Sequence, residues 1–198
     1  MKRSRSGKRY PLLMYRRTLD RLWPSLFLSG VILLVIGVYV RFASTPIAKE
    51  EAPWLFISGA LLVVLSLFFI LMRYAAYVQP HADHLRFVTP FLQMRISYRR
   101  IRSTHAAEIN ALFPPQRISR SLRSFLEPFY GQTAIVLALN GYPMPKPILR
   151  LFLTRAMFHP QGEGFILLVP DWIAFSGELE SLRSQWLSAQ KQRTTSFR

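Results

Sequence analysis

Two long segments without a charged side chain constrain this chain more than any other feature. Residues 22–40 form the first segment and residues 52–72 form the second. A helix of about 20 apolar residues is long enough to cross the hydrocarbon layer of a bilayer. The sequence therefore predicts a two-helix transmembrane hairpin over residues 22–72, preceded by a basic N-terminal tail over residues 1–21.

The basic residues are distributed unevenly around these segments. The formal net charge is +16, and it divides into +7 for residues 1–21, zero for 41–52 and +9 for 73–198. Segments rich in Lys and Arg stay in the cytoplasm. We therefore expect a multi-pass protein of the cell membrane with both termini cytoplasmic. A cleaved signal peptide is the alternative for residues 22–40, but this stretch exceeds the usual apolar length of about 7 to 15 residues.

Small side chains recur on one face of each apolar segment. Gly30 and Gly37 are seven residues apart in the first segment, and Gly59 and Ser66 are seven apart in the second. Small faces let helices approach closely, so we interpret these four residues as a helix-packing face. This face joins either the two helices of the hairpin or the hairpin to a second copy or a partner membrane protein. Neither segment contains an ionisable residue, which argues against an ion pathway or a proton relay.

Beyond Tyr74 the apolar pattern changes from continuous to alternating. Leu92, Met94 and Ile96 alternate with polar side chains, which is typical of a strand with one buried face. Turn residues divide the rest of the chain into further strands. The predicted strands are 76–82, 85–89, 92–98, 102–109, 132–139, 148–154 and 165–169.

An amphipathic helix is predicted after the last strand. Five large apolar residues recur there at steps of three and four, which places them on one helix face. They are Trp172, Phe175, Leu179, Leu182 and Trp186. We expect this stripe to cover the open end of the sheet as part of the core. Residues 191–198 would then form a C-terminal tail.

Four strands, a long connection, three strands and a C-terminal helix follow the order of the pleckstrin-homology (PH) fold. Three segments resemble the bacterial PH-like family. They are Tyr77-Val78, residues 84–87 and residues 94–103, where an apolar strand is followed by the basic residues Arg99 and Arg100 and then Ile101. In that family such a domain commonly follows two transmembrane helices. The resemblance implies a cytoplasmic PH-like domain over residues 76–190, built as a seven-stranded bent antiparallel sheet or partial barrel capped by a helix. The fold does not by itself define a ligand.

The long connection between the fourth and fifth predicted strands contains a candidate basic helix. Arg117, Arg120 and Arg123 recur there every three residues. Together with Phe113 and Phe125 they are candidates for contact with anionic lipid, because basic and aromatic side chains suit a membrane interface. The alternative is a surface helix whose arginines are only solvated.

Few residue patterns in this chain point to catalysis or to metal binding. The chain has no cysteine, which excludes disulfides and zinc-thiolate sites. We interpret His81, Asp83 and His84 as a solvated turn rather than a metal site, because a metal site needs fixed geometry and supporting residues. No nucleophile-elbow, phosphate-loop or dinucleotide motif is present, so we expect neither catalysis nor a cofactor. We interpret the basic N-terminus as a topology signal that contacts anionic lipid rather than nucleic acid.

These features predict a non-catalytic, membrane-anchored interaction module. Its PH-like domain would present a surface to a protein partner, a second copy or anionic lipid headgroups. The alternative is an accessory subunit of a larger membrane complex, docked through its transmembrane hairpin. Only residues 73–75 separate the second apolar segment from the first predicted strand, a reach of about 10–12 Å. The domain is therefore expected to lie against the lipid headgroups.

Overall fold

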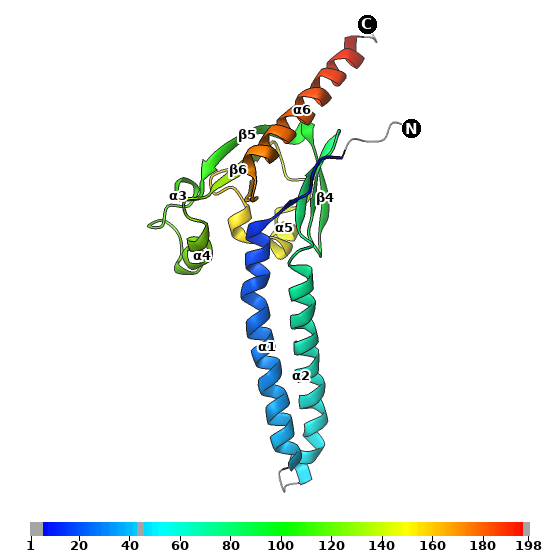
Figure 1. Ribbon diagram of the computed structural model, residues 1–198, viewed down its shortest axis with the longest axis vertical. Coiled ribbons are helices and arrows are strands. Elements are labelled where there is room, and N and C mark those ends of the chain that lie inside the picture. Colours follow the sequence, from blue (N-terminus) through cyan, green and yellow to red (C-terminus); the bar gives the residue numbers. More distant parts are fainter. Residues whose placement is uncertain (1–5, 43–45, 196–198) are drawn as a thin grey trace. The chain divides into compact units, whose positions relative to one another are not determined.

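The computed structural model describes residues 6–42 and 46–195, and the chain divides into two compact units (Figure 1). One unit spans residues 16–74. The other joins the residues up to Tyr15 with those from Ala75 onward. In sequence, the helical hairpin is therefore inserted into the second unit, which we call the sheet unit.

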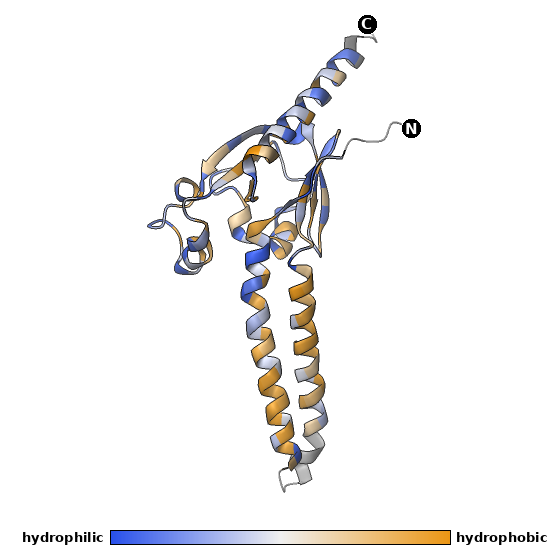
Figure 2. Cartoon of the chain, in the orientation of Figure 1, coloured by the Kyte–Doolittle hydropathy of each residue, from blue (hydrophilic) through white to orange (hydrophobic). Residues whose placement is uncertain are grey.

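Two long helices, α1 (Leu13–Phe42) and α2 (Pro46–Met72), form the hairpin and run side by side in Figure 1. By length and composition, α1 and residues 52–72 of α2 are able to span a membrane. Figure 2 shows that apolar residues cover most of both helices. α1 begins before the predicted segment 22–40, because residues 13–21 include Leu, Met and Arg side chains that favour helix.

The sheet unit contains two antiparallel sheets, with strand orders β1-β2-β3-β4 and β5-β6-β7. In the described residues, no pairing between the two sheets closes them into a barrel. The strands are β1 (Tyr10–Pro11), β2 (Tyr77–Pro80), β3 (His84–Val88), β4 (Gln93–Ser97), β5 (Ile101–Glu108), β6 (Thr133–Leu139) and β7 (Gly164–Leu167).

Four α-helices accompany these sheets. They are α3 (Ile109–Leu112), α4 (Arg120–Leu126), α5 (Lys146–Phe152) and α6 (Trp172–Thr195). Single 3-10 turns cover Tyr98–Arg100, Glu127–Phe129 and Arg155–Met157. α6 continues through the predicted tail 191–198 to Thr195, and residues 196–198 lie outside the described part of the chain.

The prediction of a strand over residues 148–154 is wrong, because α5 occupies most of this segment. Pro147 lies in the first turn of α5. At that position the fixed backbone angle of proline favours a helix, and its missing N–H is not needed for the helical hydrogen bonds. The apolar run that follows does not alternate, so its burial pattern alone does not distinguish strand from helix.

The core lies between the two sheets and is completed by α6. The ring centroids of Phe87 on β3 and Phe165 on β7 are 5.9 Å apart, so the two sheets face each other. Trp172 and Trp186 of α6 are half-buried. The buried residues of the predicted stripe are Phe175, Leu179 and Leu182, of which the first two are fully buried. The core role predicted for the centre of the stripe is confirmed.

The N-terminal residues depart most from the prediction of a basic tail over residues 1–21. Tyr10 of β1 pairs with Val78 of β2, which adds a fourth strand to the first sheet. The Tyr10 hydroxyl donates to the Glu178 carboxylate of α6 at 2.9 Å, and the Lys8 N–H donates to the same carboxylate at 3.2 Å. Burial, reinforced by Glu178, raises the pKa of Tyr10 to about 12.

Residues 6–12, which we call the N-terminal strap, also tie the two ends of the hairpin insertion together. The Leu12 N–H donates to the carbonyl of Ala76 at 3.1 Å, and the Leu13 N–H donates to the carbonyl of Leu168 at 3.0 Å. The Leu12 side chain is buried. The residue that precedes α1 is therefore hydrogen-bonded to the residue that precedes β2.

We expect Glu178→Ala to destabilise the sheet unit by about 1–3 kcal/mol, because the part-buried Tyr10 hydroxyl and the Lys8 N–H lose their acceptor. Urea unfolding of the full chain in detergent, followed by tryptophan fluorescence, measures this difference. Glu163→Ala, the loss of the same charge at an exposed loop position, is the matched control and should cost less than about 0.5 kcal/mol. Equal stability of the two variants would contradict a structural role for the strap.

Candidate functional site

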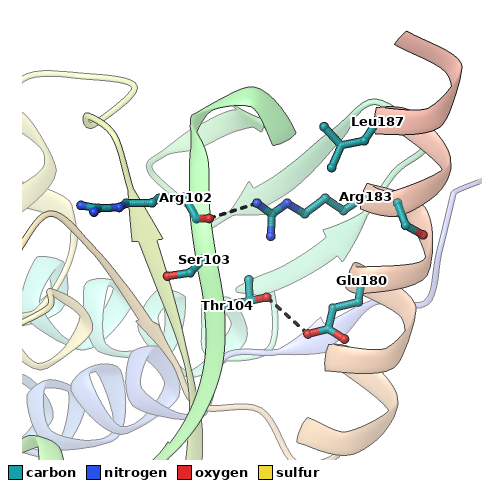
Figure 3. Close-up of a pocket in the computed structure, with 7 residues that line it drawn as sticks. Arg102, Ser103, Thr104, Glu180, Arg183 and Leu187 are labelled. Carbon is teal, nitrogen blue, oxygen red and sulfur yellow. Dashed lines mark hydrogen bonds between the residues drawn. The ribbon is translucent and has the colours of Figure 1, made fainter. Parts of the chain in front are cut away.

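An open groove of about 310 Å³ lies between strand β5 and helix α6 (Figure 3). β5 forms one wall and the outer half of α6 forms the other. The lining residues are Arg102, Ser103 and Thr104 from β5, and Glu180, Arg183, Ser184 and Leu187 from α6. None of these residues was predicted as part of a site, because the groove forms only where α6 passes beside an edge strand.

Arg183 connects the two walls of the groove. Its Nη2 atom donates to the carbonyl oxygens of Ile101 at 2.7 Å and Arg102 at 3.1 Å, as the dashed line to Arg102 shows in Figure 3. The Thr104 hydroxyl contacts a Glu180 carboxylate oxygen at 3.5 Å. The helix wall therefore carries charges of both signs close to the backbone of β5.

Main-chain groups of β5 are the feature of this groove that is able to pair with another chain. β5 pairs with β6 along one side, and within the described residues no strand pairs with its other side. An edge strand presents N–H and C=O groups that an extended chain can pair with. The exposed Leu187 adds an apolar surface at the end of the groove.

The predicted basic helix is present as α4, and its arginines are exposed. Arg117 precedes the helix, whereas Arg120 and Arg123 lie on it. The Ser119 hydroxyl accepts a hydrogen bond from the Leu122 N–H at 3.4 Å, which caps the start of the helix. The three guanidinium groups form no ion pair with other described residues.

The expectation that Phe113 and Phe125 contact lipid is wrong. Phe113 is 4% exposed and Phe125 is 8% exposed, so both belong to the core beneath this connection. The rings of Phe125 and Phe129 pack edge to face, with centroids 6.3 Å apart. The helical period predicted around Phe125 is correct, but a period does not reveal whether an apolar face meets protein or lipid.

A second basic and apolar surface, on α5, was missed because a strand was predicted there. Ile148 and Leu151 are exposed on this helix, and the charged residues Lys146 and Arg150 are exposed beside them. Pro147 was the available signal for a helix at this position.

The four small residues of the hairpin contact the opposite helix. A methyl group added at Gly30 would approach the Gly59 carbonyl oxygen to 3.0 Å, and one added at Gly59 would approach the Gly30 oxygen equally closely. A methyl group at Gly37 would lie 3.4 Å from Leu55. The Ser66 hydroxyl donates to the carbonyl of Trp23 at 3.0 Å. The small faces of α1 and α2 therefore pack against each other within the hairpin.

The histidine cluster lies at the turn between β2 and β3. The rings of His81 and His84 stack with centroids 4.9 Å apart and an interplanar angle of 3°, and His84 Nδ1 lies 2.7 Å from a carboxylate oxygen of Asp83. Burial, and then the neighbouring His84, lower the pKa of His81. Among the described residues, no three His, Cys, Asp or Glu side chains are grouped to hold a metal ion.

Comparison with protein-family models, with curated proteins and with solved structures found no match for this chain.

The lowered pKa of His81 predicts a loss of stability in mild acid. The unfolded chain binds the proton more readily, because the unperturbed pKa of histidine is about 6.5. The stability contributed by neutral His81 is therefore present above pH of about 6.5 and is lost as the pH falls through the lowered pKa of the folded state. His81→Gln should flatten this acid loss in thermal unfolding curves recorded across the pH range, whereas the exposed control His105→Gln should retain it. Parallel pH profiles for His81→Gln and the parent chain would contradict this assignment.

Proposed function

We propose that this protein is a non-catalytic, membrane-anchored interaction module, in which a hairpin holds a PH-like domain at the cytoplasmic face of the cell membrane. The main support for this proposal is the connection of both ends of the apolar hairpin to one folded unit through very short segments. Leu12 alone separates β1 from α1, and residues 73–76 separate α2 from β2. Four residues reach at most about 14 Å, so the sheet unit stays close to the surface of any membrane that the hairpin spans.

The shared folded unit also supports a defined topology. A folded domain occupies one side of a membrane, and the N-terminal strap pairs with β2, which follows α2. Both ends of the hairpin then face the same side. The high density of Lys and Arg in the residues outside the hairpin favours the cytoplasm for that side.

The architecture of the sheet unit supports a PH-like domain. Two antiparallel sheets, of four and three strands, face each other and are followed by a long helix that packs into the core. The strand contributed by Tyr10–Pro11 and the helix in place of the predicted strand 148–154 are departures from the order expected for that fold.

Two surfaces support contact with anionic lipid. Arg117, Arg120 and Arg123 are exposed and have no ion-pair partner among the described residues. α5 exposes Ile148 and Leu151 beside basic residues, the combination found in helices that lie at a membrane interface. Each basic residue near an anionic leaflet contributes about 1 kcal/mol of attraction.

The alternative proposal, an accessory subunit docked through the hairpin, has less support. Its interface would be the small-residue faces of α1 and α2. Those faces already contact each other at Gly30 and Gly59 and at Ser66 and Trp23, so docking through them would require the hairpin to open.

The topology predicts that reporters fused before residue 1 and after Arg198 both report a cytoplasmic location. Because the chain has no cysteine, Ser44→Cys gives a single thiol in the connector 41–52, whose residues 43–45 lie outside the described part of the chain. This thiol should react with a membrane-impermeant maleimide added to intact cells. Ser103→Cys on β5 is the control and should react only after lysis. An external reporter at either terminus would contradict the proposed topology.

The lipid contact predicts that changing Arg117, Arg120 and Arg123 together to Gln weakens binding to an anionic membrane. The full chain is placed in nanodiscs with and without phosphatidylglycerol, and hydrogen exchange is measured for the amides of residues 117–126. Phosphatidylglycerol should protect these amides in the parent chain but not in the triple variant, and high salt should reduce the protection.

A matched control removes the same charge elsewhere. Arg95, Arg99 and Arg155 are also exposed in the sheet unit. Their joint replacement by Gln should leave the protection of residues 117–126 intact. Equal protection in the parent chain and the Arg117, Arg120 and Arg123 variant would show that these arginines are only solvated.

A further inference from the structure

We propose that the outer edge of β5 is a self-pairing surface, at which two copies of this chain join through antiparallel pairing of β5 with β5. The partner is therefore a second copy of this chain, added as a strand to the second sheet. All the contacts that support this pairing lie within the sheet unit, and the pairing is independent of the function proposed above.

β5 is the longest strand at an edge of either sheet. It has eight residues, whereas the other edge strands β1, β4 and β7 have two, five and four. The edge of β7 is partly covered, because Phe158 forms a bridge to Phe165 and the His159 N–H donates to the carbonyl of Gly164 at 3.1 Å. β5 therefore offers the longest row of main-chain groups for pairing.

The outer edge of β5 also lacks the usual protection against pairing. Natural edge strands are commonly guarded by lysine, proline, a bulge or a covering segment. Residues 103–108 contain neither lysine nor proline. The one register shift lies at the start of the strand, between Ile101 and Ser103, where Arg183 binds the carbonyl oxygens. Past that point, no described residue outside the β5–β6 ladder forms a hydrogen bond with a main-chain group of this edge.

The charges along the strand are self-complementary. Thr104 contacts Glu180, so the period of two places Ala106 and Glu108 on the face of β5 that meets α6. Glu108 is exposed at the C-terminal end of β5, and Arg183 of α6 lies beside Ile101 at the N-terminal end of β5. Neither residue forms an ion pair with another described residue. An antiparallel second copy reverses the order, so that Glu108 of each copy comes close to Arg183 of the other.

Hydrogen-bond geometry restricts the possible registers. In an antiparallel pair, the N–H and C=O groups of two facing residues either both point toward the partner strand or both point away from it. This direction alternates along a strand, so two residues of identical strands can face each other only when their numbers differ by an even number. The symmetry axis of the pair then passes through a residue and not between two residues. The register centred on His105 pairs Ser103 with Ala107 and Thr104 with Ala106, and it brings Glu108 opposite Arg102, whose carbonyl binds Arg183.

The electrostatics of the groove distinguish this register from its neighbour. A register centred on Ala106 would bring Glu108 of the second copy opposite Thr104, beside the carboxylate of Glu180. Two carboxylates at that point repel each other, and like charges facing each other across a sheet are destabilising. The arrangement of Glu180 and Arg183 along α6 therefore favours the register centred on His105 over the register centred on Ala106.

Single cysteines test this arrangement directly, because the chain has none of its own. The full chain is kept in its membranes and oxidised with copper phenanthroline. His105→Cys should form a disulfide-linked dimer, because facing Cα atoms lie about 4.5–5.5 Å apart. Ser103→Cys alone should not, because four residues of offset separate the two Cα atoms by about 14 Å, beyond the ~7 Å limit for a disulfide.

Two further experiments test the proposed register and the proposed attraction between Glu108 and Arg183. Ser103→Cys and Ala107→Cys chains that are expressed together should form a mixed dimer that neither chain forms alone. In the His105→Cys chain, Glu108→Arg should abolish the disulfide-linked dimer, and Arg183→Glu in the same chain should restore it. Glu163→Arg, the same charge change at an exposed position on another loop, should leave the dimer unchanged.

Three results would overturn the proposal. The first is the absence of a His105→Cys dimer in a chain that resists trypsin as the parent chain does. The second is a disulfide that forms through Ala106→Cys or Ser103→Cys but not through His105→Cys. The third is the recovery of an extended segment of another protein cross-linked to His105→Cys, which would assign the edge to a heterologous peptide.

Discussion

The strap of residues 6–12 is the constraint on which the rest of this structure depends. It adds a strand to the first sheet, and the Leu12 N–H bonds to the carbonyl of Ala76. Residues that lie more than sixty positions apart in the chain are thereby joined at the two ends of the hairpin. The strap is in turn held by Glu178 of α6, through the Lys8 N–H and the Tyr10 hydroxyl. The strap, the first sheet and α6 are consequently linked by hydrogen bonds within one compact unit.

This arrangement has a mechanical consequence for any membrane-bound form of the protein. A domain attached to a membrane through one flexible linker can rotate and move away from the surface. Here the chain enters and leaves the hairpin through one residue and four residues, respectively, so neither connection provides a long linker.

The two binding surfaces proposed here use different physical interactions. The exposed arginines near α4 would act through long-range attraction to anionic headgroups, which salt screens. The edge of β5 would act through directional main-chain hydrogen bonds, with Glu108 and Arg183 selecting the register. The two contacts are therefore separable by experiment, because ionic strength should weaken the first much more than the second.

The sequence by itself determined the two apolar helices, six of the strands in outline and the C-terminal helix with its buried centre. Each has a strong period or a long uncharged run, and such signals arise from local geometry and burial. Phe125 shows the limit of this reasoning, since its helical spacing predicted an apolar face but not that the face meets protein. The α5 segment shows the same limit, because an apolar run without alternation fits a strand or a helix.

Only the tertiary structure decided the role of the N-terminal residues and the location of the groove. Tyr10–Pro11 is too short to give a strand signal, and it becomes a strand because β2 supplies a partner edge and Glu178 supplies an acceptor. The groove exists because α6 passes beside β5, and Arg183 and Ile101 are 82 positions apart in sequence. Long-range pairing of this kind depends on which segments become neighbours on folding, and a local sequence pattern does not contain that information.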